Sequence, residues 1–434
     1  MLLPMKYTTG VRFSTIAATA LLGGFALAAT PWIKGVTDKG PLDYAVGEDM
    51  TFTLTVQHAQ DLPPGLKLCW TRTGDDGQEQ KGTVDPASPL VVKTSLNRPG
   101  FVRLYAELRK ADGKPWRTAD AKGKKAPVFF DGGAAADPRK LRPTKPLPAD
   151  FEAFWAKRKA ELAAVPMTAN LEEIASPTPG AKLYKVSIAC AGPRPSTGYL
   201  SIPEAPGKYP ATIGFHGYGA SWGANATNPP KKVPTDALHL IVSAHGFELG
   251  REPASYRDFR KSVCRNGYGH AFDPEENAKP ETCYFGGMAW RVMRGIEYVK
   301  SRPEWNGKDL TVTGGSQGSL QAMWGAALVP GVTAAKISIP WFCDVGGTED
   351  GRNHGDWYPK WAPGLDYYDQ ANIARLVPKT CRVDISRAGL GDYIAPPCGV
   401  AIMYGNLACP KSIVWVQGST HGYVPPQPQR VTWK

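Results

Sequence analysis

The stretch Leu310-Thr311-Val312-Thr313-Gly314-Gly315-Ser316-Gln317-Gly318 places a short apolar run directly before a glycine-rich turn. The run 317–328 that follows has the pattern of a buried helix, so this region predicts a strand, a tight turn and a helix. The turn reads G-x-S-x-G, in which small neighbours let a strained backbone expose a serine hydroxyl between strand and helix. Ser316 is therefore the candidate nucleophile.

From residue 183 onward, short apolar runs alternate with helical patterns. Met288, Val292, Ile296 and Val299 share one face of a helix expected over 285–301. Buried strands separated by helices imply an α/β fold with a mostly parallel sheet, whose active residues lie at the carboxyl edge. The expected strands are 183–189, 198–202, 211–215, 238–243, 310–313, 335–339, 382–386 and 412–416.

The preceding region, residues 30–131, shows alternation of period two and no helical period. Met50, Phe52, Leu54 and Val56 alternate with polar residues, and Pro63-Pro64-Gly65 is one of several turn signals. This pattern predicts a small all-β domain, an immunoglobulin-like sandwich. It could bind polysaccharide, contact a partner protomer or cap the larger domain, and a structural appendage is the default.

The rest of the chain divides into a linker and a catalytic region. Residues 132–149 are rich in Gly, Ala, Pro and Lys and are expected to form the linker. Asp150 is a candidate helix N-cap, so the α/β-hydrolase catalytic domain is expected over 150–434.

The first 29 residues have the character of a signal peptide. Lys6 and Arg12 precede the apolar segment 16–26, and Ala26-Leu27-Ala28 offers small residues for cleavage. No later segment reaches about 18 uninterrupted apolar residues. The sequence thus predicts export to the periplasm or the extracellular space, cleavage, and no membrane span in the mature protein.

Composition restricts the class of partner. The 47 glycines and 40 prolines argue against a helical bundle, and the net charge of +12 is spread along the chain. No nucleic-acid motif is present, so no nucleic-acid partner is expected. Eight cysteines in an exported chain predict disulfides, and Cys264 and Cys283, which bracket one polar loop, are the expected pair.

A serine hydroxyl needs a base to become a nucleophile. Only His354 and His421 follow Ser316 in the chain. His421 comes after the last predicted apolar strand, between glycines at 418 and 422, whereas His354 lies in a polar, Trp-rich insertion. Since the order serine, acid, histidine is typical of α/β-hydrolases, His421 is the candidate base.

The orienting acid should follow the strand before the last one. Asp392 lies in the loop after the predicted strand 382–386. Asp344 and Asp350 come one strand too early, and Asp384 lies within the strand. Asp392 is therefore the candidate acid.

The negative oxygen that develops when a serine attacks a carbonyl carbon needs two N–H donors. One is expected from Gln317, the residue after the nucleophile, and the other from Tyr218 in the loop Phe215-His216-Gly217-Tyr218. His216 is expected to shape this loop rather than to transfer a proton.

From Asp150 to the C-terminus, the chain resembles the acetyl xylan esterase and cephalosporin-C deacetylase family of α/β-hydrolases. The matching segments are Asp150-Phe151-Glu152-Ala153-Phe154-Trp155, Phe215-His216-Gly217-Tyr218, Thr313-Gly314-Gly315-Ser316-Gln317-Gly318, Gly389-Leu390-Gly391-Asp392 with Pro396-Pro397, and His421. The chain departs from the family pattern at Ala244-His245-Gly246, where Arg-Gly-Gln is usual, and at Gly422, where glutamate is common.

The resemblance implies a Ser316–His421–Asp392 triad, with the Tyr218 and Gln317 amides as oxyanion hole. It also implies a secreted serine esterase that removes acetyl groups from carbohydrates such as acetylated xylan or xylo-oligosaccharides, without metal or organic cofactor. The substrate is then the acetylated carbohydrate, and a homo-oligomer is a possible assembly. Two alternatives stay open: a hydrolase of feruloyl, longer acyl or peptide bonds, favoured by the Trp-rich insertion 341–361, and a non-catalytic carbohydrate-binding protein.

Overall fold

The computed structural model describes residues 30–119, 123–219 and 227–434. A ten-stranded mixed sheet forms the centre of the C-terminal two thirds, in the order β10-β11-β12-β14-β13-β15-β16-β17-β18-β19. Strands β14 to β18 pair in parallel, whereas the strands at both ends of the sheet pair antiparallel. The strands of this sheet are β10 (Ala169–Ile174), β11 (Ala181–Ile188), β12 (Ser196–Pro203), β13 (Tyr209–Phe215), β14 (Leu238–Ser243), β15 (Trp305–Gly315), β16 (Ala334–Ser338), β17 (Arg382–Gly389), β18 (Lys411–Val416) and β19 (Arg430–Trp433).

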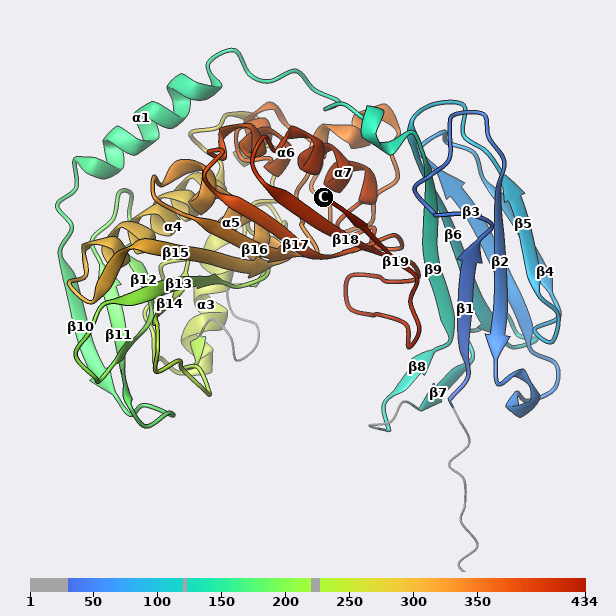
Figure 1. Cartoon of the computed structure of the whole chain (residues 1–434), viewed down its shortest axis with the longest axis horizontal. Helices are drawn as coiled ribbons and strands as arrows, with labels where there is room; N and C mark the ends of the chain where they lie inside the picture. The colour runs from blue at the N-terminus through green and yellow to red at the C-terminus, as the bar shows by residue number, and fades with distance from the viewer. Residues whose placement is uncertain (1–29, 120–122, 220–226) are drawn as a thin grey trace, which may run out of the picture.

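Helices cover this sheet, and in Figure 1 α4 to α7 lie above it while α3 lies below. They are α1 (Phe151–Ala163), α3 (Pro253–Val263), α4 (Tyr284–Ser301), α5 (Gln317–Leu328), α6 (Gln370–Ile373) and α7 (Pro397–Asn406). The α/β class expected from the sequence is confirmed, with a parallel centre and antiparallel flanks. Asp150 occupies the N-cap position of α1, but its carboxylate accepts a hydrogen bond from the Tyr367 hydroxyl and caps no backbone N–H.

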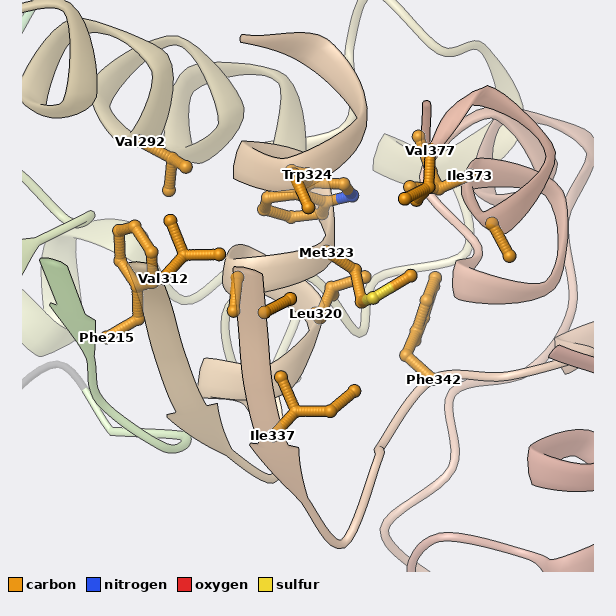
Figure 2. Close-up of a cluster of buried hydrophobic side chains, with 14 of the residues drawn as sticks. Phe215, Val292, Val312, Leu320, Met323, Trp324, Ile337, Phe342, Ile373 and Val377 are labelled. Carbon is orange, nitrogen blue, oxygen red and sulfur yellow. The ribbon is translucent and has the colours of Figure 1, made fainter. Parts of the chain in front are cut away.

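Helix α5 lies at the centre of the core. Nearly every face of this helix is apolar and buried, as expected for a helix that lies between a sheet and other helices. Figure 2 shows its apolar side chains meeting those of the sheet and the neighbouring helices. The labelled residues are Phe215, Val292, Val312, Leu320, Met323, Trp324, Ile337, Phe342, Ile373 and Val377.

Between residues 32 and 136 the described chain forms two antiparallel sheets and one small hairpin. One sheet has the order β1-β2-β5 and the other β4-β3-β6-β9, and both contribute to a separate buried apolar cluster. This β region stands at the right of Figure 1, with β9 beside β18 and β19. Its strands are β1 (Trp32–Thr37), β2 (Met50–Gln57), β3 (Lys67–Gly74), β4 (Gln80–Val84), β5 (Leu90–Thr94), β6 (Gly100–Arg109), β7 (Arg117–Ala119), β8 (Lys125–Pro127) and β9 (Phe129–Ala136).

The boundaries of this region differ in one place from the expectation. Strand β9 pairs with β6 up to Ala136, so residues 132–136, expected in a linker, belong to a sheet. Small residues hid this strand, because glycine and alanine have low strand propensity. The immunoglobulin-like character of the region and its status as a separate domain remain predictions.

The predicted signal peptide, residues 1–29, lies outside the described residues. Within the described ranges, no helix combines the length and the apolar character needed to cross a membrane.

Candidate active site

Ser316 lies between the end of β15 and the first residue of α5. Its backbone has φ 57° and ψ −126°, a conformation that non-glycine residues rarely adopt and that is typical of strained functional turns. A Cβ at Gly314 would lie 2.1 Å from the Gly318 carbonyl oxygen, and one at Gly318 would lie 2.4 Å from that of Phe215. The glycines therefore let β15, α5 and β13 approach closely enough to form the turn.

His421 follows β18 in a loop and reaches the nucleophile. Its Nε2 lies 2.9 Å from Ser316 Oγ, and its Nδ1 lies 2.8 Å from Asp392 Oδ2. With the proton on Nδ1, the imidazole donates to Asp392 and accepts from the Ser316 hydroxyl. Arg387 donates to the His421 carbonyl oxygen at 3.1 Å, which fixes the backbone of this loop.

Asp392 lies in the loop after β17 and is only 1 % exposed. Besides His421, its carboxylate accepts from the backbone N–H groups of Ile394 and Ala395 at 3.2 and 3.0 Å. The Gly391 N–H donates to the Ser419 carbonyl oxygen, so the acid loop and the histidine loop are joined directly. The carboxylate is thus fixed in position on the far side of the imidazole from Ser316.

The structure brings Ser316, His421 and Asp392 together at the carboxyl ends of β15, β18 and β17. The other candidates lie elsewhere: His354 is bonded to the carbonyl oxygen of the next residue, and Asp384 pairs with Arg382 within β17. Asp344 binds Thr144 and Asp350 pairs with Arg98. Within the described part of the chain, none of these four side chains forms a hydrogen bond with the Ser316 hydroxyl.

The loop after β13 passes beside the nucleophile. A Cβ at Gly217 would lie 3.8 Å from Ser316 Cβ, so Gly217 lies next to the nucleophile. Gln321 of α5 donates to the His216 carbonyl oxygen at 2.9 Å and so ties this loop to the helix. Gln317, the first residue of α5, follows Ser316 directly.

Two histidines near the site, the half-buried His216 and the buried His270, have lowered pKa values. Burial lowers the pKa of His216 to about 4 and that of His270 to about 3. Among the described residues, the His216 Nε2 atom has no hydrogen-bond partner, whereas the His216 carbonyl oxygen accepts from Gln321. His421 is half-buried and is the histidine in contact with Ser316.

Aromatic side chains gather next to Tyr218. Its ring stacks on His270 at 4.1 Å between centroids, and Trp357 meets it edge-on at 5.3 Å. Trp341 donates its ring N–H to the Trp357 carbonyl oxygen, and Trp357 remains 41 % exposed. The insertion 341–361 therefore contacts Tyr218 of the candidate site. The stacking of His270 on Tyr218 was not predicted, because no motif in the sequence singled out His270.

The predicted disulfide is absent. All eight cysteines are free in the structure, so the expected bridge between Cys264 and Cys283 is not formed. Cys283 instead donates to the Lys279 carbonyl oxygen within its own loop. Bracketing a loop in sequence does not bring two Sγ atoms to bonding distance, which needs a specific Cβ geometry.

Among the described residues, no group of three or more His, Cys, Asp or Glu could hold a metal ion.

Comparison with known proteins finds similar sequences and structures. Residues 137–347 match the family model of acetyl xylan esterase (AXE1). The resemblance predicted from the sequence is thereby confirmed for this part of the chain, which contains Tyr218, Ser316 and Gln317 and ends before Asp392. The acetyl esterase Axe7A of Xylanibacter ruminicola is 27% identical over 286 residues, which cover 63% of this chain and 63% of that protein. The chain therefore spans less than two thirds of that relative's length.

Two solved structures show the same fold. An acetyl xylan esterase from Paenibacillus sp. R4 is 22% identical with a TM-score of 0.54, and covers 66% of this chain and 94% of its own. Acetyl xylan esterase 1 from Thermoanaerobacterium sp. JW/SL YS485 is 21% identical with a TM-score of 0.55, and the match covers 67% and 93% of the two chains. Proteins named acetyl esterase or acetyl xylan esterase are carboxylic ester hydrolases, the class expected for this chain.

Proposed function

We propose that this chain is an exported serine esterase that removes acetyl groups from carbohydrates, with acetylated xylan or its oligosaccharides as substrate. The observation that supports it most is the continuous hydrogen-bond chain from Asp392 through His421 to Ser316, on a strained turn. The names of the similar proteins support the choice of acetyl as the group removed and of xylan as the carbohydrate.

In the proposed reaction, Ser316 Oγ attacks the ester carbonyl carbon while His421 Nε2 takes the hydroxyl proton. Asp392 holds the neutral imidazole in the Nδ1–H tautomer and stabilises the imidazolium that forms. The imidazolium then gives its proton to the sugar oxygen as the C–O bond breaks, which leaves an acetyl group on Ser316. A water molecule, deprotonated by His421, attacks this acyl-enzyme and releases acetate, and the proton returns to Ser316.

The negative oxygen of each tetrahedral intermediate is proposed to accept from the Gln317 and Tyr218 amides. Gln317 begins a helix, so its N–H also carries the partial positive charge of the helix N-terminus. Loss of one such donor costs roughly 3 kcal/mol in the barrier. The sugar is proposed to lie against the exposed ring of Trp357, because aromatic faces pack well on sugar rings.

The test measures acetate release from acetylated xylan by the wild-type protein, Ser316→Ala and His421→Ala. Each variant is expected to lose roughly 10⁴–10⁶-fold in kcat, because the nucleophile and its base act as one unit. His354→Ala is the matched control, since this histidine is exposed and bonded to its own loop, and it is expected to retain activity. Full activity in folded Ser316→Ala would rule the proposal out.

A substrate panel separates the remaining alternatives. Acetyl, butyryl and feruloyl esters and a peptide are compared by kcat/KM, because the aromatic residues near Tyr218 could equally line a larger acyl site. Preference for feruloyl esters or peptides would replace the acetyl assignment. Binding of xylan without any ester turnover would favour a carbohydrate-binding protein.

A further inference from the structure

Strand β9 of the β region lies directly against the loop that carries Asp392. A Cβ at Gly391 would lie 1.7 Å from the Asp131 carbonyl oxygen, and one at Gly133 would lie 3.0 Å from that of Leu390. The two backbones therefore touch with no side chain between them. A displacement of β9 is therefore expected to act on Gly391, the residue before Asp392.

The same strand also holds the loop that carries His421. Gln417, four residues before the histidine, is 2 % exposed and pairs with the backbone of Gly133 in both directions. Its Nε2 donates to the Gly133 carbonyl oxygen at 2.8 Å, and its Oε1 accepts from the Gly133 N–H at 2.9 Å. The ring of Phe129 packs on Tyr423 at 5.4 Å, on the other side of the histidine.

An ion pair between a buried carboxylate on β9 and a half-buried arginine links β9 to the segment after Asp392. Arg103 of β6 binds the Asp131 carboxylate through two hydrogen bonds of 2.9 and 2.7 Å. The guanidinium of Arg103 lies 4.4 Å above the ring of Tyr393, the residue after Asp392. Burial raises the pKa of Asp131 to about 6, and the nearby charge of Asp392 contributes to this rise.

We propose that Asp131, paired with Arg103, is a positioning residue of the esterase reaction, and that the β region thereby forms part of the support of the active site. The inference rests on the proposed function. Asp131 touches neither Ser316 nor substrate. It acts through Gly391, Tyr393 and Asp392, whose placement sets the distance from His421 to Ser316.

The test compares kcat and KM of the full-length wild-type protein and of Asp131→Asn. The amide keeps the shape of the side chain but leaves Arg103 without a counter-charge. We expect kcat to fall roughly 10–100-fold with KM within about twofold, because small displacements of reacting groups lower the rate without changing substrate binding. Arg103→Lys is the second variant, which keeps the charge but loses the paired hydrogen bonds. It should also lower kcat and leave KM nearly unchanged.

Asp76→Asn provides the matched control. Asp76 forms a buried ion pair with Arg72 in the same β region, through bonds of 2.8 Å, and Arg72 otherwise binds Thr94, Gln78 and Ser95. This variant loses an Arg–Asp pair whose arginine is more deeply buried than Arg103 and which has no hydrogen bond to the active-site loops. It is expected to lower the thermal unfolding midpoint while kcat of the folded protein stays within about twofold of wild type.

The rate at which a fluorophosphonate labels Ser316 gives a readout that needs no acetylated sugar. Labelling is expected to slow in Asp131→Asn and Arg103→Lys but not in Asp76→Asn. If the wild type is labelled yet releases no acetate, the substrate assignment fails while the positioning test still stands. Wild-type kcat and labelling in folded Asp131→Asn or Arg103→Lys, or an equal loss in Asp76→Asn, would overturn the inference.

Discussion

Ser316 shows how a single residue stores strain. Its positive φ places the hydroxyl toward His421, and a strained non-glycine conformation of this kind costs on the order of 1–3 kcal/mol. The close contacts of Gly314 and Gly318 with neighbouring backbone keep the turn in place. Next to it, His216 could be mistaken for a second base because it lies two residues before Tyr218 in the same loop.

The pH dependence of the reaction distinguishes the two histidines. Because burial lowers the pKa of His216 to about 4, its imidazole is already neutral above about pH 5 and does not change charge over the working range. We expect His216→Asn to lower kcat/KM by the same factor at every pH from about 5 to 9. The measurement is the kcat/KM profile on a soluble acetyl ester, and a displaced acid limb in the variant would contradict the prediction.

At the scale of elements, α5 begins directly after the nucleophile and also forms the centre of the core. Leu320, one turn after Ser316, is fully buried between the sheet and the neighbouring helices (Figure 2). Trp324, one turn further, donates its ring N–H to the Tyr368 carbonyl oxygen at 3.0 Å. The position of the nucleophile therefore depends on the packing of the whole helix.

Leu320→Ala tests this dependence. Removing a buried leucine side chain leaves a cavity, so we expect the free energy of unfolding to fall by about 2–5 kcal/mol. The measurement is urea unfolding followed by tryptophan fluorescence. Leu147→Ala, at a leucine that is 39% exposed, should change it by less than about 0.5 kcal/mol. Equal effects of the two substitutions would contradict the packing described for α5.

At the scale of the whole molecule, the β region and the α/β region share a core. Phe101 and Ala135 of the β region belong to the same buried cluster as Trp415 of β18, and the rings of Phe101 and Trp415 lie 5.8 Å apart. The Asn353 N–H donates to the buried Asp75 carboxylate at 3.0 Å across the same boundary. Apolar contact of this kind couples two regions more strongly than a polar interface does.

We therefore expect the full-length chain to unfold in one cooperative transition. Heating followed by circular dichroism and by tryptophan fluorescence should give coincident curves. Arg98→Ala removes an exposed ion pair with Asp350 and two hydrogen bonds to backbone carbonyl oxygens at this boundary, and should lower stability by about 1–3 kcal/mol. Two separated transitions would show that the β region folds independently.

Local patterns predicted much of the fold and of the candidate site. The helix 317–328 and the strand 238–243 have the expected bounds. Each is defined by an apolar run with turn residues at its ends, and these signals lie next to each other in the sequence. The serine–acid–histidine order selected Ser316, Asp392 and His421, which the structure brings together. The strands β10 and β19 were missed, since each lies at an edge of the sheet and is mostly polar or short.

By itself, the sequence determined the nucleophile turn, the alternation of strands and helices, and the order of the three side chains, because each depends on neighbours along the chain. Only the tertiary structure decided that β9 supports the loops of Asp392 and His421. Gly133 and Gln417 are 284 positions apart. Their contact depends on how two sheets pack, and no periodicity or spacing records which residues such packing brings together.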